Sequence, residues 1–264
     1  MKQLLFGLGM VVLMSVAMAQ DAFDFTATKQ KAEQGDAEAQ FEVGRCYVHG
    51  DGVAVDMGEA MKWFRLSAEQ GNARSQFNLG LGYAMGEGVS EDLAEAMKWF
   101  RKAAEQGYAE AQNNLAIGYD YGDGVPEDKA EAAKWYLKAA EQGFVKAQHN
   151  IGVCYEDGIG VAADKVEAVK WYRKAAEAGE ALAQNRLSEC YRTGSGVEKD
   201  LAEAVAWCRK AAEQGLDSAQ HNLGAYYYFA KGVPQNRDEA KKWFTKAAEQ
   251  GHEQAKRALD LFFR

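Results

Sequence analysis

The sequence predicts an all-α protein, an α/α solenoid of antiparallel helix pairs, and three observations indicate this fold class. The six tryptophans recur at a constant interval of 36 residues, and glycines from Gly35 to Gly251 recur at the same interval. Between two such glycines, apolar residues twice follow the spacing of an amphipathic helix. A fixed period without insertions is typical of a solenoid, in which each repeat packs only on its neighbours.

The first helix of each repeat is expected from position +2 to +14, where +0 is the opening glycine. In the second repeat, which opens at Gly71, its apolar face contains Ser75, Leu79, Gly80 and Tyr83. Glycine costs about 1 kcal/mol inside a helix relative to alanine. A glycine at +9 therefore indicates that another helix backbone approaches closely at this point.

A tight turn and a second helix complete the repeat. The pattern Gly-x-Gly-Val at +15 to +18, as in residues 86–89, supplies the turn. The second helix is expected from +22 to +34, with Trp99 and Phe100 on its apolar face in the second repeat. Asp92 and Glu95 form a capping box at its start. The glycine of the next repeat ends the helix.

The repeated segments resemble Sel-1-like repeats, a family related to tetratricopeptide repeats. The resemblance rests on AQNNLAIGY at residues 111–119, GDGV at 122–125 and KWYLKAA at 134–140. It covers residues 35–250 as six full repeats, followed by a first helix at 251–264. The resemblance implies helix pairs stacked into a right-handed superhelix, with the first helices lining its concave face.

Residues 1–19 are expected to be a secretory signal peptide. Lys2 precedes an uncharged run from Leu4 to Ala19 that ends in small residues, as in cleavable signals. The run is shorter than the roughly 20 residues that span a bilayer, which disfavours the alternative of a permanent anchor. Cleavage after Ala19 would place the mature protein in the periplasm or outside the cell, with no stable membrane insertion.

The domain boundaries follow from the period, and fourteen helices are expected. Residues 20–34 form an N-terminal capping helix and 251–264 a C-terminal one, each covering one end of the repeat array. The six repeats are 35–70, 71–106, 107–142, 143–178, 179–214 and 215–250.

Composition and motifs argue against several function classes. The net charge of −8 disfavours nucleic acid as a partner. The chain has no Cys-x-x-Cys, His-Glu-x-x-His, phosphate loop or dinucleotide fingerprint. Cysteine-rich members of the resembled family are associated with penicillin binding and β-lactamase activity. However, none of the seven serines begins a Ser-x-x-Lys motif. We therefore expect no catalytic residues, cofactor or metal, and a monomer.

Histidine and cysteine are two other residue types that could form a metal site or a disulfide. His149 and His221 share position +6 but lie two repeats apart, too far for one metal ion. Cys190 and Cys208 lie in one repeat, and the family resemblance implies a possible disulfide between the two helices of that repeat. Their offset along an antiparallel hairpin, about 6 Å, favours free buried thiols over that bridge.

A partner is expected to bind where the repeats differ on a shared face. Positions +3, +6, +10, +13 and +14 of the first helices vary and are expected opposite the core. This stripe is apolar in the first two repeats, polar and mainly acidic in the middle, and aromatic in the sixth. Clustered exposed apolar groups are unusual on a solvated face, although ordinary drift on an exposed face is the competing interpretation.

Asparagine at +7 adds a second signal. In related tetratricopeptide repeats, an asparagine before the Leu-Gly pair contacts a bound peptide, and an amide can both donate to and accept from a peptide unit. A packing role is the alternative. The candidate binding residues are Phe41, Phe77, Asn78, Leu81, Met85, Asn114, Tyr121, His149, Asn150, His221, Asn222, Tyr228 and Phe229.

The sequence thus predicts an exported, non-catalytic scaffold or adaptor that binds a protein or peptide through the concave face. Two alternatives remain: a cell-wall-related or penicillin-recognising hydrolase, and a secreted effector that acts on a host protein.

Overall fold

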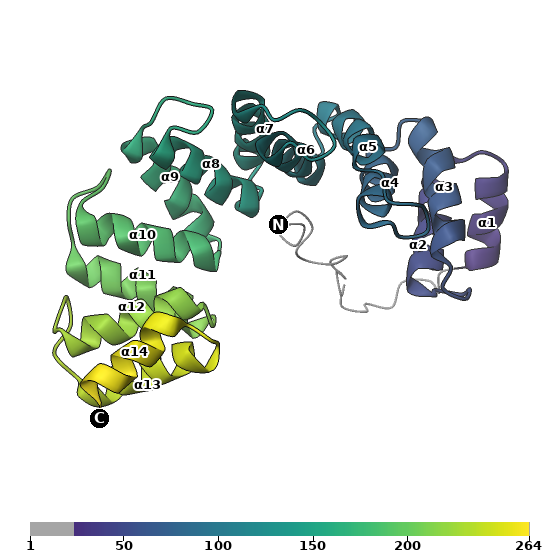
Figure 1. The fold of residues 1–264 in the computed structure, drawn as a ribbon. Helices are drawn as coiled ribbons and strands as arrows, with labels where there is room; N and C mark the ends of the chain where they lie inside the picture. Colours follow the sequence, from purple (N-terminus) through teal and green to yellow (C-terminus); the bar gives the residue numbers. More distant parts are fainter. Residues whose placement is uncertain (1–23, 264) are drawn as a thin grey trace. The chain divides into compact units, whose positions relative to one another are not determined.

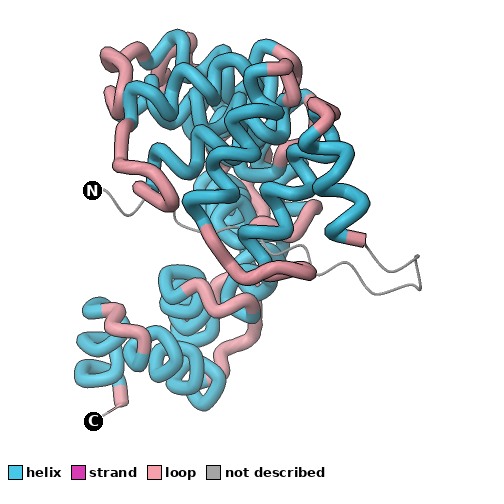
Figure 2. Tube along the Cα trace, turned by 90° about the vertical axis from the view of Figure 1, so that its right-hand side faces the viewer, coloured by secondary structure: helices cyan, strands magenta, loops and turns pink. Residues whose placement is uncertain are grey.

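The computed structural model describes residues 24–263, so the predicted signal peptide lies outside the described residues. This part of the chain contains fourteen helices and no strands. Figure 2 shows these helices joined by loops. It divides into two compact units, with the boundary between Ala139 and Ala140. The all-α prediction and the number of helices are therefore confirmed.

The helices alternate between the two types expected from the sequence. The first unit holds α1 (Phe25–Glu33), α2 (Ala37–His49), α3 (Met57–Glu69), α4 (Ala73–Met85), α5 (Leu93–Glu105), α6 (Ala109–Tyr121) and most of α7 (Lys129–Glu141). The second holds α8 (Val145–Asp157), α9 (Lys165–Glu177), α10 (Ala181–Thr193), α11 (Leu201–Glu213), α12 (Asp217–Tyr228), α13 (Arg237–Glu249) and α14 (Glu253–Phe262).

Within each unit, neighbouring helices stack in sequence order (Figure 1). The first helix of a repeat, such as α4, contacts the second helix of the preceding repeat and that of its own repeat. This nearest-neighbour packing is the arrangement of an α/α solenoid.

The predicted capping residues lie at the helix ends. Asp92 is the N-cap of α5, and its Oδ1 accepts a hydrogen bond from the Glu95 backbone N–H at 2.9 Å. Gly86 ends α4 with φ of +70°, in the left-handed region. The second turn glycine, Gly88, also has a positive φ, +72°, and lies against the backbone of Met57 in the preceding repeat.

The sixth repeat departs from this pattern at its turn. Ala230 stands where the other repeats have the first turn glycine, and it is the one non-glycine residue with positive φ, +55°, in residues 24–263. The preceding helix α12 ends one residue early, at Tyr228. The turn thus forms without glycine, at the expense of backbone strain.

Replacing Ala230 by glycine is expected to raise the free energy of unfolding by about 0.5–1 kcal/mol. Glycine relieves a left-handed conformation that costs alanine about 1–2 kcal/mol, and this exceeds the entropy it adds to the unfolded chain. Urea denaturation followed by circular dichroism measures the change. Ala230→Val should have the opposite effect, and stabilisation by valine would contradict the explanation.

Glycine at +9 makes the close contact expected of it, but with an aromatic ring instead of a helix backbone. A Cβ on Gly80 would lie 2.6 Å from the ring of Phe100 at +29. Three other repeats have the same pairing. In the fifth repeat Cys208 replaces the ring, and Ser188 takes the place of glycine, its Oγ donating to the Ala204 carbonyl at 2.7 Å. The two positions thus compensate each other in size.

A column of buried glutamines at +5 connects three successive helices and was not predicted from the sequence. Gln76 is 4% exposed. Its Nε2 donates to the Ala68 carbonyl on α3 at 3.0 Å, and its Oε1 accepts from Gln106 Nε2, after α5, at 2.7 Å. The column comprises Gln40, Gln76, Gln112, Gln148, Gln184 and Gln220. Each amide gives a second donor to a carbonyl in the last turn of the preceding helix, which also accepts from the backbone N–H three residues on.

Candidate binding surface

A pocket lies on the exposed side of α2 and α4 in the first unit. Its volume is about 20 Å³, room for about one water molecule, and it brings together Asn78, Leu81 and Met85, three of the predicted binding residues. Its full lining is Val48, Met57, Met61, Phe64, Asn78, Leu81, Gly82, Met85 and Glu87. The expected apolar end of the stripe therefore exists as a concave surface in the first two repeats.

Phe41 is not part of an exposed surface, so this prediction was wrong. Its side chain is 4% exposed, with its ring centroid 5.9 Å from that of Phe64. The guanidinium of Arg74, from the next repeat, covers its other side at 4.3 Å from the ring centroid.

Position +6 as a whole faces the junction between consecutive repeats. The Phe77 ring lies 5.8 Å from Phe100 and 5.1 Å from Tyr108 of the next repeat. His221 likewise stacks on His252 at 4.8 Å, with its ring centroid 5.6 Å from that of Phe244. Phe77 and His221 are therefore packing residues, because the aromatic at +29 and position +1 of the next repeat both reach them.

His149 follows the same pattern in the second unit. Its ring centroid lies 5.9 Å from that of Tyr172. Burial lowers the pKa of His149 below its usual value, so the imidazole is neutral at pH 7. Tyr172 donates its hydroxyl hydrogen to Glu156 at 2.6 Å. Burial is the main cause that raises the pKa of Tyr172, and this hydrogen bond is the second cause.

The acidic middle of the stripe is explained by tyrosine at +29. Where this position is tyrosine, position +13 carries a carboxylate that accepts from its hydroxyl, as in Tyr172–Glu156 and Tyr136–Asp120. Where it is Phe64 in the first repeat, position +13 is the apolar Val48. The change in polarity along the stripe therefore follows the identity of the core residue at +29.

Three of the four asparagines at +7 make hydrogen bonds within the protein, and their predicted role in peptide binding stays a proposal. Asn78 Nδ2 donates to the Arg74 carbonyl at 2.8 Å, one helical turn away. Asn222 Nδ2 lies 3.5 Å from Asn185 Oδ1. Asn150 Oδ1 lies 3.3 Å from Nδ1 of His149, and Asn114 is partly exposed.

Two aromatic residues of the stripe are well exposed. Tyr121 is 56% exposed and has Lys129 Nζ 5.7 Å from its ring centroid. Phe229 is 51% exposed, next to a partly buried Tyr228 that stacks on Phe262 at 4.2 Å. Tyr228 is therefore mainly a contact of the C-terminal helix α14.

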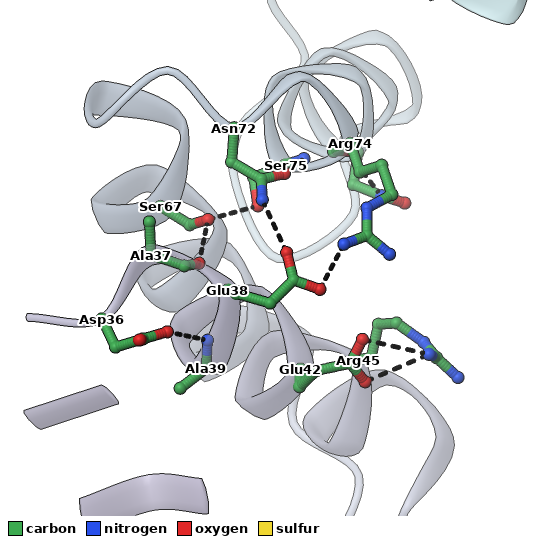
Figure 3. A network of polar contacts seen from close by, with 11 residues as sticks. Asp36, Ala37, Glu38, Ala39, Glu42, Arg45, Ser67, Asn72, Arg74 and Ser75 are labelled. Carbon is green, nitrogen blue, oxygen red and sulfur yellow. Dashed lines mark hydrogen bonds and ion pairs between the residues drawn. The ribbon is translucent and has the colours of Figure 1, made fainter. Parts of the chain in front are cut away.

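A polar network crosses the junction of the first two repeats (Figure 3). Glu38 on α2 accepts from Asn72 Nδ2 at 3.2 Å and forms an ion pair with Arg74. Beneath it, Ser75 Oγ donates to Ser67 Oγ at 2.7 Å, and Ser67 Oγ donates to the Ala37 carbonyl at 2.6 Å. These contacts join the N-terminal parts of α2 and α4 and the end of α3.

The four cysteines are separate buried thiols. Burial is the main cause that raises the pKa of Cys46 to about 11, and those of Cys190 and Cys208 to about 12. Cys208 Sγ donates to the Ala219 carbonyl at 3.2 Å. The Cys190–Cys208 bridge raised by the family resemblance is therefore not formed.

These thiols are expected to be unreactive in the folded protein. At pH 8 a thiol with a pKa of 11 is ionised in roughly one molecule in a thousand, and the thiolate is the nucleophile. Ellman's reagent should detect no thiol in the native protein and four after denaturation without reductant. Ser90→Cys, at an exposed loop position, should add one fast-reacting thiol as a control. Detection of only two thiols after denaturation would contradict the structure.

Two features are absent from the described residues. No group of three or more His, Cys, Asp or Glu side chains in residues 24–263 is placed to hold a metal ion. Over the same range, none of the helices combines the length and apolar character needed to cross a membrane.

Comparison with known proteins gives a consistent result. The Sel1 repeat family matches residues 37–72, 73–108, 109–144, 145–180, 181–216 and 217–252. A protective antigen of uropathogenic Escherichia coli with an SLR fold is 43% identical, with a TM-score of 0.84 over 88% of this chain and 50% of that one. A Sel1 repeat protein from Oxalobacter formigenes is 37% identical, with a TM-score of 0.73 over 81% of this chain and 86% of that one. The chain thus spans half the length of the Escherichia coli protein. No curated protein matches the chain.

Proposed function

The chain belongs to the Sel1 repeat family, and on this premise we propose that it is a non-catalytic scaffold that binds a protein or peptide through the first helices of its repeats. The observation that carries the proposal is the division between repeated and variable positions. Repeated columns such as Trp99 and Gln76 are buried. Variable residues such as Leu81 and Met85 line a pocket at the surface.

We also propose that the protein is exported. The basic start and apolar run of residues 1–19 support a cleavable signal. The similarity to a bacterial protective antigen is in keeping with a location outside the cytoplasm. Fractionation of expressing cells, with the mass of the mature protein, tests this: export with cleavage after Ala19 gives a chain that begins at Gln20.

Site-specific photo-crosslinking in cells tests the scaffold function. A photoreactive amino acid at Leu81, in the pocket, or at exposed Tyr121 should give discrete adducts with another protein. The matched control is Leu66, which is 45% exposed on second helix α3. Equal adducts from position 66, or none from the first-helix positions, would refute binding through these helices.

The asparagine column has its own test. Joint replacement of Asn78, Asn114 and Asn150 by alanine should weaken partner capture while the helical circular dichroism is retained. Unchanged capture of the partner would mean that these asparagines contribute to helix packing instead of binding. The rival enzyme function requires nitrocefin turnover or covalent labelling by a fluorescent penicillin, and either result would overturn the non-catalytic proposal.

A further inference from the structure

The contact between α12 and the start of α14 is made by two histidines. The rings of His221 and His252 stack with their centroids 4.8 Å apart and an angle of 18° between their planes. His252 is also the N-cap of α14, and its Nδ1 accepts a hydrogen bond from the Ala255 backbone N–H at 3.3 Å. An imidazole nitrogen can accept a hydrogen bond only while it carries no proton. This contact therefore requires a neutral His252.

The same two positions, +6 of one repeat and +1 of the next, hold other residues elsewhere in the chain. The other pairs are Phe41 and Asn72, Phe77 and Tyr108, Asn113 and Phe144, His149 and Glu180, and Asn185 and Leu216. Only the junction after the sixth repeat has an imidazole at both positions. Histidine is the side chain whose ordinary charge change falls between pH 5 and 8, so this junction is the one whose charge changes in that range.

His149, at +6 of the fourth repeat, has charged neighbours that His221 lacks. Two carboxylates and a guanidinium act on its pKa, from +1 and +7 of the next repeat and +13 of its own: Glu180, Arg186 and Glu156. Around His221 the same three positions are His252, Ala258 and Tyr228. A positive charge on His221 therefore has no carboxylate at these positions to compensate it.

The other charged groups on the surrounding helices are paired or exposed. On α14, Lys256 Nζ lies 2.8 Å from Glu253 Oε1, and Arg257 and Asp260 are exposed. On α12, the Asp217 carboxylate accepts from the Ser218 backbone N–H at 2.7 Å. The charged side chains of α11 and α13 are exposed, apart from two that have partners: Arg209, which donates to Tyr227, and Glu239, which pairs with Lys242. α13 presents to His221 the uncharged ring of Phe244.

The docked helix favours the neutral form of His221. Burial, and then the neighbouring His252, lower the pKa of His221 below its usual value. A histidine with a lower pKa in the docked state binds protons preferentially when the helix is released. The docked arrangement is therefore fully favoured above the usual histidine pKa of about 6.5, and it loses stability as the pH falls below that value.

We propose that the junction between α12 and α14 is an acid-sensitive contact, in which protonation of His221 and His252 favours release of α14. The two imidazolium rings repel each other. The N-cap hydrogen bond is lost, and a cation stands at the positive end of the helix dipole. Because Phe262 still holds the far end of α14 to Tyr228, the change is a shift in the docking equilibrium.

Release of α14 changes the surface of the second unit. Phe244 on α13 is 1% exposed, and it forms one core cluster with Ala255 and Ala258 of α14. An apolar face of α13 is therefore covered at neutral pH and becomes accessible at acidic pH. This inference is independent of the proposed scaffold function.

Hydrogen exchange of the full chain, followed by mass spectrometry at pH 7.5 and 5.0 with labelling times scaled to the intrinsic rates, tests the proposal. Loss of an N-cap and a cation at a helix N-terminus each weaken a helix several-fold, so the protection of the α14 amides should fall about tenfold at pH 5.0. The internal control is α4, whose junction contains Phe41 and Asn72. Neither residue titrates in this range, so protection of α4 should change by less than about twofold.

The double variant His221→Phe/His252→Asn is the matched control, because it carries the residues of the first junction. Asparagine is a good N-cap that does not titrate, so α14 should be protected at pH 7.5 at least as well as in the unaltered protein. At pH 5.0 its protection should fall by no more than about twofold. His252→Asn alone keeps His221, and its protection should fall about threefold.

Three results would overturn the proposal: protection of α14 that is the same at both pH values, an equal fall in α4, or a tenfold fall that persists in the double variant. If the double variant fails to dock α14 at pH 7.5, His252→Asn alone decides. A fall in that variant as large as in the unaltered protein would show that the N-cap histidine has no part in the acid response.

Discussion

Gly88→Ala is expected to lower the free energy of unfolding by about 2–5 kcal/mol. Gly88 has φ of +72°, a conformation that costs alanine about 1–2 kcal/mol. An added Cβ would also lie 2.2 Å from the backbone carbonyl oxygen of Met57. That atom belongs to the start of α3 and cannot rotate away, so the two repeats must separate locally, at a further cost of about 1–3 kcal/mol.

Gly71→Ala is the matched control. Gly71 has φ of +96° and no atom within 4 Å of its added Cβ, so only the conformational cost remains. Urea denaturation of both variants, followed by helical circular dichroism, measures the difference. Equal destabilisation would show that the contact between Gly88 and Met57 contributes nothing.

Gln76→Leu is expected to destabilise the protein by about 1–2 kcal/mol although it places an apolar residue in a buried site. Leucine removes the side-chain donor to the Ala68 carbonyl on α3, which keeps its bond from the Gly71 N–H, and a buried hydrogen bond contributes about 0.5–1.5 kcal/mol. It also removes the acceptor of Gln106 Nε2. Because Gln106 is exposed, water can replace that bond.

Gln106→Leu removes only the exposed half of this arrangement and is the control. Its effect should stay below about 1 kcal/mol. Thermal and urea unfolding of the two variants give the comparison. A Gln76→Leu protein as stable as the wild type would mean that the hydrogen bonds of the column make no net contribution.

The sequence alone predicts the helices and their ends well, because six repeats form an internal alignment. Trp99, Asp92 and Gly86 recur at fixed intervals, and each has a local physical reason for its position. The glutamine column carried a signal that could have been recognised. A polar residue repeated six times beside buried alanines indicates an obligatory hydrogen bond.

The binding surface was predicted less well, for a reason of geometry. Phe41 and His221 were expected opposite the core of their own repeat, but each contacts the aromatic at +29 of that repeat, and the next repeat covers them as well. Helical periodicity shows which residues share a face of one helix. It gives no information on the angle at which the next helix packs. The pocket likewise joins Val48, Met57 and Asn78 from three helices or turns, so only the folded packing reveals it.

The glutamine column has a consequence for how such a protein can evolve. The hydrogen bonds of Gln76 go to a main-chain carbonyl and to another glutamine, and no residue of the pocket lining takes part in them. Substitutions at Leu81, Met85 or Glu87 therefore leave the cross-links between helices intact. Natural variation can change what is recognised while the cost in foldability stays small, and new specificities can arise by point mutation without rebuilding the repeat.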